Sequence, residues 1–185
     1  MILFVVGNNH AIAAQAVNRY NTAGEDKNYN LNGNSSHPAN LAVSWANKLA
    51  NALKMKLTLS DACNTNEEIR DSINNWINSV SRRLTPDEIF IIAGWNDTNN
   101  TDEVDIRNYH IYLDQLQIKH IFFSTYIKLA IDYNFRDAYV DWTYIDHIRN
   151  KNMNTVIMSD TYYGADAHAE WANYLLNHIV KNSML

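Results

Sequence analysis

Polar residues that can carry chemistry follow directly after two of the most apolar runs in the chain. Asn9 and His10 come after the first run, and Asn96 and Asp97 come after the strongest one. Amide, imidazole and carboxylate groups bind polar ligands, and an imidazole can also act as a general base. These positions therefore predict a polar-ligand or acid–base site. The alternative for Asn96 and Asp97 is an ordinary turn, because Asn and Asp side chains hydrogen-bond to their own backbone. The alternative for His10 is a loop histidine that hydrogen-bonds to the backbone.

A second group of candidates lies near the C-terminus. Tyr162 and Tyr163 precede the last helical pattern, where a tyrosine ring can stack on a sugar and its hydroxyl can hydrogen-bond to the ligand. The alternative is partial burial of both rings against that helix. His168 falls inside the helical pattern, so we expect it to have a structural role.

Cys63 is the only cysteine, so an internal disulfide is excluded. A reactive thiol needs a cationic neighbour or a helix N-terminus that lowers its pKa. Cys63 lies just before a predicted helix cap at Thr65, so a nucleophilic role is one alternative. Most lone cysteines are small buried hydrophobic residues, and we expect that role here.

Composition excludes several classes of function. The net charge is −5, and the 15 basic residues form no cluster, so no nucleic-acid partner is expected. The seven histidines show no ligand-like spacing and no glycine-rich phosphate loop is present, so no metal and no cofactor are predicted. No apolar run approaches the ~18 residues of a membrane helix, and the N-terminus lacks the basic start of a secretion signal.

Short apolar runs alternate with helical patterns along the chain. The predicted strands are Ile2–Val6, Lys56–Leu59, Glu88–Ala93, His120–Ser124 and Thr155–Met158. The predicted helices are an Ala-rich segment within 8–20, a stripe at Leu41, Trp45, Leu49 and Leu53 opened by Ser36–Pro38, a capped segment from Thr65 to Val80, Val104–Leu116 and Ala165–Val180. Residues 22–37 have the composition of a long polar surface loop, and 126–154 show no clear period.

This alternation predicts one domain over residues 1–185, built as a three-layer α/β/α sandwich around a mainly parallel sheet. Ligands of such folds bind beyond the carboxyl ends of the strands. The segments that matter are then those around Gly7–His10, Ala62–Asn66, Gly94–Asp97 and Ser159–Gly164.

Four of these polar segments, in their order, resemble the sequence blocks of the SGNH (GDSL-like) hydrolase family, especially a divergent phage branch. Gly7–Ala13 reads GNNHAIA where the family reads like GCSHTAG, and Cys63–Ile69 reads CNTNEEI where the phage branch reads like GxSNxxI. Gly94–Asp97 keeps the GxND block as GWND. Tyr162–Ala172 reads YYGADAHAEWA where the family has a run like HPSAExHxxWA. The resemblance implies a flavodoxin-like sheet of the SGNH type.

The chemistry implied by the resemblance is ester hydrolysis by a serine, a histidine and an aspartate, with an oxyanion hole that stabilises the transition state. The serine position is held here by Asn9, which is not a nucleophile. The histidine position is held by Tyr162, or by Tyr163 after a shift of one residue, which puts the aspartate position at Ser159 or Asp160.

The oxyanion-hole positions implied by the resemblance are only partly kept. The second-block glycine, whose backbone N–H is one donor of the hole, corresponds to Cys63. The third-block asparagine, whose side chain is another donor of the hole, is kept as Asn96.

Three hypotheses about function follow. The first is a non-catalytic, phage-type accessory or virion-associated protein that binds a glycan or a protein partner, such as a phage structural protein. Its binding residues would be Asn9, His10, Asn66, Asn96, Asp97, Tyr162 and Tyr163. The second is an active esterase or carbohydrate deacetylase that uses Cys63, His10, Ser35 or Ser36. The third is a purely structural or assembly role. Under any of the three hypotheses, the expected location is the cytoplasm of an infected cell or the virion.

Overall fold

A parallel β-sheet forms the centre of the computed structural model, which describes residues 1–7, 42, 44–95, 101–124, 139–140 and 165–185. Within these residues the strands are β1 (Ile2–Gly7), β2 (Lys56–Ala62), β3 (Ile89–Trp95), β4 (Lys119–Ser124) and β5 (Tyr139–Val140). Their order is β2-β1-β3-β4-β5, and every neighbouring pair is parallel. This is the strand order of flavodoxin-like sheets.

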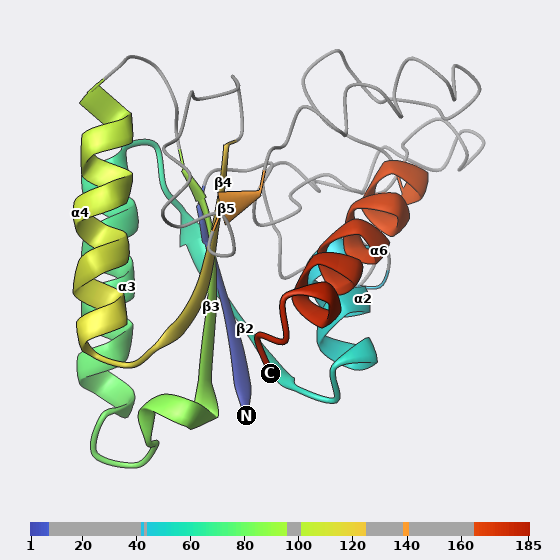
Figure 1. Cartoon of the computed structure of the whole chain (residues 1–185), viewed down its shortest axis with the longest axis horizontal. Helices are drawn as coiled ribbons and strands as arrows, with labels where there is room; N and C mark the ends of the chain where they lie inside the picture. Colours follow the sequence, from blue (N-terminus) through green and yellow to red (C-terminus); the bar gives the residue numbers. More distant parts are fainter. Residues whose placement is uncertain (8–41, 43, 96–100, 125–138, 141–164) are drawn as a thin grey trace, which may run out of the picture.

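Helices cover both faces of the sheet (Figure 1). On one face lie α2 (Trp45–Ala52) and α6 (Ala165–Lys181), and on the other lie α3 (Asn66–Val80) and α4 (Thr101–Gln115), with a short 3₁₀ turn η3 (Pro86–Glu88) before β3. The α/β class and the three-layer architecture predicted from the sequence are therefore confirmed. None of the described helices combines the length and the apolar character needed to cross a lipid bilayer.

The two faces of the strands supply two separate cores, because successive side chains of a strand point in opposite directions. Leu3 and Val5 of β1 pack with the residues of α2 and α6, whereas Phe4 and Val6 pack with those of α3 and α4. The predicted buried face of the last helix is confirmed, with these residues at most 1% exposed: Trp171, Leu175 and Ile179.

The stripe that begins at Leu41 does not form one continuous helix. Ser44 has an extended backbone (φ −63°, ψ 144°), and its hydroxyl accepts a hydrogen bond from the N–H of Asn47, so Ser44 is the N-cap of a new helix. Trp45 and Leu49 are buried as predicted, while Leu53 is the C-cap residue and only partly buried. Ser36–Pro38 and Leu41 lie outside the described residues.

Two further strand predictions need correction. The polar turn predicted to begin at Gly94 does not begin there, because β3 continues through Gly94 to the buried Trp95. The predicted aperiodic segment 126–154 contains β5, whose two residues pair with β4. The predicted strand Thr155–Met158, the Ala-rich helix within 8–20 and the loop 22–37 lie outside the described residues.

Candidate functional site

Because all strand pairs are parallel, the C-terminal ends of the strands lie along the same side of the sheet, which we call the carboxyl edge. Gly7 of β1 pairs with Gly94 of β3, and Trp95 of β3 pairs with Ser124 of β4. The strands that residues 8 and 96 follow in the sequence, β1 and β3, are therefore adjacent in the sheet. Most of the predicted site residues lie outside the described residues. They are Asn9, His10, Ser35, Ser36, Asn96, Asp97, Ser159, Asp160, Tyr162 and Tyr163.

A backbone hydrogen bond joins the first two polar segments at this edge. The N–H of Cys63 donates to the carbonyl oxygen of Gly7 over 2.9 Å. Gly7 has a φ of 145°, a conformation that a residue without Cβ adopts at little cost. The register between β1 and β2 also shifts here, so that Gly7 pairs with Ala62. The glycine is thus required by the backbone geometry that places its carbonyl against Cys63.

The Cys63 side chain is held as a buried thiol. It is 6% exposed, and its Sγ donates to the carbonyl oxygen of Asp61 over 3.6 Å. Burial raises the pKa of Cys63, and the nearby carboxylate of Glu68 raises it further. Because the thiolate is the nucleophilic form, this environment disfavours catalysis by Cys63. The expectation that Cys63 is a small buried hydrophobic residue agrees with this geometry.

The start of α3 faces the same edge and is acidic. Thr65 is the N-cap, and its Oγ1 accepts from the N–H of Glu68 over 3.1 Å, as the sequence predicted. The Glu68 carboxylate in turn accepts from the N–H of Asn64, one residue before the cap. Glu67 also lies in the first turn. Two carboxylates offset the positive end of the helix dipole, so this helix start does not favour an anionic ligand.

Asn66 is the one predicted binding residue that the structure describes. It is the first residue of α3, directly after the Thr65 cap, and it is partly exposed. Its position beside Cys63 and the end of β2 places it at the carboxyl edge. A carboxamide there can both donate to and accept from a ligand hydroxyl.

Trp95 was missed as a site-positioning residue because the sequence favoured a polar turn at 94–97. Its ring is fully buried, with an edge-on contact to Phe122 (centroids 5.6 Å apart) and a tilted contact to Tyr109 (6.2 Å). It fixes the last residue of β3, from which Asn96 follows directly. The available sequence signal was a tryptophan between Gly94 and the polar pair Asn96–Asp97.

His168 has the structural position that we expected for it. It is 2% exposed, and its Nδ1 accepts from the backbone N–H of Trp45 over 3.4 Å. That N–H is at the start of α2, where backbone donors lack partners within the helix. A side chain of α6 therefore caps α2, next to the cap supplied by Ser44.

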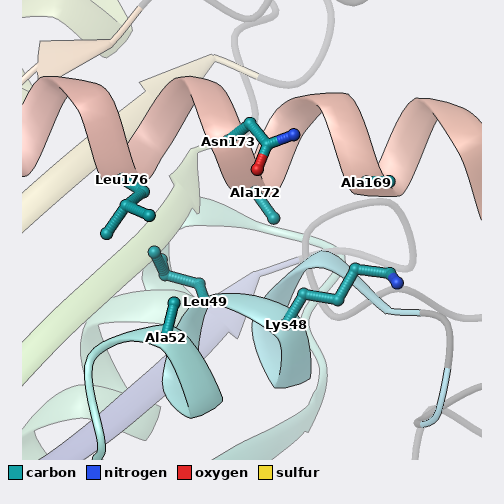
Figure 2. A pocket seen from close by; sticks show the side chains of 7 residues that line it. All are labelled: Lys48, Leu49, Ala52, Ala169, Ala172, Asn173 and Leu176. Carbon is teal, nitrogen blue, oxygen red and sulfur yellow. The ribbon is translucent and has the colours of Figure 1, made fainter.

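A groove of about 310 Å³ lies between α2 and α6 (Figure 2). Figure 2 shows Leu49 of α2 and Leu176 of α6 pointing toward each other, with Lys48 and Asn173 as the polar groups. The other lining residues are Ala52, Ala169 and Ala172. The volume is at the lower limit for small-molecule sites. Of the predicted site residues that the structure describes, neither Cys63 nor Asn66 lines this groove.

Within the part of the chain that the structure describes, no group of three or more His, Cys, Asp or Glu residues could hold a metal ion. In comparisons with known proteins, no protein-family model, no curated protein and no solved structure matches the chain.

Proposed function

We propose that this chain is a non-catalytic module of the SGNH type that binds a neutral glycan at the carboxyl edge of its sheet. The observation that carries the proposal is the hydrogen bond from the Cys63 N–H to the Gly7 carbonyl. In the resemblance described above, the N–H at the Cys63 position is a donor of the oxyanion hole. An N–H already bonded within the protein cannot also stabilise a developing oxyanion.

The loss of this oxyanion-hole donor costs catalysis much more than it costs ligand binding. Removing one oxyanion-hole donor lowers the turnover of a hydrolase by about 10²–10³-fold. The serine position is also held by Asn9, whose carboxamide offers no nucleophile. A binding site does not depend on either group, so the same edge can hold a ligand without transforming it.

Electrostatics favours a neutral ligand. Glu67 and Glu68 lie at the start of α3, and the chain carries a net charge of −5. An anionic ligand would be repelled, whereas sugar hydroxyls match the paired donor and acceptor groups of Asn66 and Asn96. Tyr162 and Tyr163 are aromatic residues suited to stack on sugar rings. We assign the module to a phage-type accessory or virion-associated protein.

Hydrolysis is the first test. Purified protein is incubated with p-nitrophenyl acetate and with an acetylated glycan, beside a blank without protein and a Cys63→Ala variant. We expect no turnover above the blank from either protein. Turnover that Cys63→Ala abolishes would overturn the proposal in favour of an esterase or deacetylase.

Binding is the second test. Glycan-array binding followed by calorimetry compares the wild type with Asn96→Ala and with Asn51→Ala, an exposed asparagine of α2 that serves as the control. We expect Asn96→Ala to weaken glycan binding about tenfold, as for the loss of one hydrogen bond, with no change for Asn51→Ala. A protein that captures a phage structural protein but no glycan would refute the glycan assignment.

A further inference from the structure

Two histidines meet where α4 returns to the sheet. His110 of α4 and His120 of β4 lie with Nδ1 and Nε2, respectively, 2.7 Å apart. The other ring nitrogen of His120, Nδ1, lies 2.7 Å from the carbonyl oxygen of Ile118. His120 is 4% exposed, whereas His110 is partly exposed. The pair therefore joins the C-terminal half of a helix to the first half of the following strand.

The positions of the protons follow from the acceptors. The carbonyl oxygen of Ile118 can only accept, so His120 carries a proton on Nδ1. In a neutral His120 the Nε2 then has a lone pair, and His110 must donate from its own Nδ1. At neutral pH both rings are thus in the Nδ1–H tautomer. In His120 the Nδ1–H donates to the Ile118 carbonyl, and in His110 it donates to Nε2 of His120.

We propose that the His110–His120 pair is a proton-sensitive switch that holds α4 against β4 with no proton or one added proton, and releases it when a second is added. One proton on Nε2 of His110 leaves the bond between the rings intact and makes it charge-assisted. A second proton, on Nε2 of His120, places two N–H donors against each other. Two imidazolium rings at that distance repel, and the contact is lost.

The surroundings set the order in which the two rings take up protons. Asp114, one helical turn beyond His110 on α4, favours a positive charge on both rings, while burial opposes it. Burial lowers the pKa of His110, and it lowers that of the more buried His120 to about 4. On β3, the register partner of His120 is Ile91, which carries no charge. His110 therefore takes the first proton and His120 the second.

Release affects one side of the sheet only. Leu113 of α4 and Ile118 before β4 belong to the core shared with α3, and the turn between them closes through the Ile118 N–H to the Leu113 carbonyl. Loss of the histidine contact loosens this turn and the last part of α4. The carboxyl edge lies at the other end of β4, since His120 is the second residue of a strand that ends at Ser124. The switch is thus spatially separate from the proposed glycan site.

Nitrogen NMR of the histidine rings tests the closed state directly. In ¹⁵N-labelled wild-type protein near neutral pH, we expect both His110 and His120 to show the Nδ1–H tautomer. Free histidine prefers the other tautomer, so the result is diagnostic. An Nε2–H tautomer for either ring would overturn the proposal.

Hydrogen–deuterium exchange tests the release. We expect exchange in residues 109–121 of the wild type, corrected for its intrinsic pH dependence, to rise about tenfold or more between about pH 7 and about pH 4. Exchange in His110→Gln should rise less than in the wild type, because a carboxamide can turn and accept from a protonated His120. The matched control is His178→Gln on α6, which should behave as the wild type. Equal rises in all three proteins would refute the switch.

Discussion

The α2/α6 face and the α3/α4 face of the sheet each contain a buried histidine among the described residues, and the two rings use Nδ1 in opposite ways. His168, on α6, accepts through Nδ1 from the backbone N–H of Trp45. His120, on β4, donates through Nδ1 to the backbone carbonyl of Ile118. The backbone group that each ring faces decides its tautomer. A helix start offers donors, and the carbonyl before β4 offers an acceptor, so the same residue type stabilises two different junctions.

The largest expected effect is the loss of stability when a large buried side chain is truncated, compared between the two cores. Trp171 of α6 is fully buried and packs edge-on against Phe123 with ring centroids 5.4 Å apart. Trp171→Ala should lower the free energy of unfolding by about 3–5 kcal/mol, measured by urea denaturation. Ile73→Ala on α3, also fully buried, removes a smaller side chain and should cost less, within a range of about 2–5 kcal/mol. A greater cost for Ile73→Ala would contradict this ranking, and the exposed Val180→Ala is the control.

The next effect is the pH dependence of the α3/α4 face. Burial lowers the pKa of His120 from 6.5 to about 4 in the folded protein, so the unfolded chain binds a proton more readily. The stability that depends on a neutral His120 is complete above about pH 6.5 and is lost as the pH falls toward about 4, by about 3 kcal/mol in total. Urea denaturation of the wild type and of His120→Leu across this range measures it. A difference between the two proteins that does not change with pH would contradict the prediction.

A smaller effect tests the α2/α6 face. His168→Ala removes the acceptor of the Trp45 N–H, and an unsatisfied buried donor costs about 1–3 kcal/mol. His168→Asn places a carboxamide oxygen close to the position of Nδ1 and should recover part of that loss. Urea denaturation of the two variants gives the comparison. Equal losses would show that the ring contributes packing rather than a cap.

The smallest effect concerns the exposed helix start at the carboxyl edge. Thr65→Ala removes one cap hydrogen bond of α3 and should cost about 1 kcal/mol. Ser44→Ala removes the corresponding bond of α2, but Ser44 is fully buried, so its loss should cost more. Thermal unfolding of both variants tests this order. A larger shift for Thr65→Ala would indicate that exposure does not weaken the cap.

The sheet was predictable because its strands are short apolar runs bounded by polar residues. The start of β1 at Ile2 and the cap at Thr65 were predicted correctly, since each depends on a local pattern of a few residues. The break at Ser44 was missed because the four-residue spacing of apolar side chains continues across it. β5 was missed because two residues are too few to show a period.

The contacts at the candidate site were less accessible to prediction from the sequence. The bond from Cys63 to Gly7 joins backbone groups that lie 56 positions apart, and its existence depends on how β2 pairs with β1. His110 and His120 are ten residues apart, but their meeting depends on the tight turn between α4 and β4. The predicted residues on 8–10, 96–97 and 159–163 lie outside the described residues, so their roles stay predictions.

The hydrogen bond between Cys63 and Gly7 also bears on whether catalysis can return. If the chain descends from a hydrolase, restoring the serine by Asn9→Ser leaves the Cys63 N–H engaged with the Gly7 carbonyl. The single replacement therefore restores a nucleophile without the full oxyanion hole, and recovering the missing donor requires the backbone pairing of β1 with β2 to change as well. Because that pairing belongs to the core sheet, a step back costs stability before it gains activity.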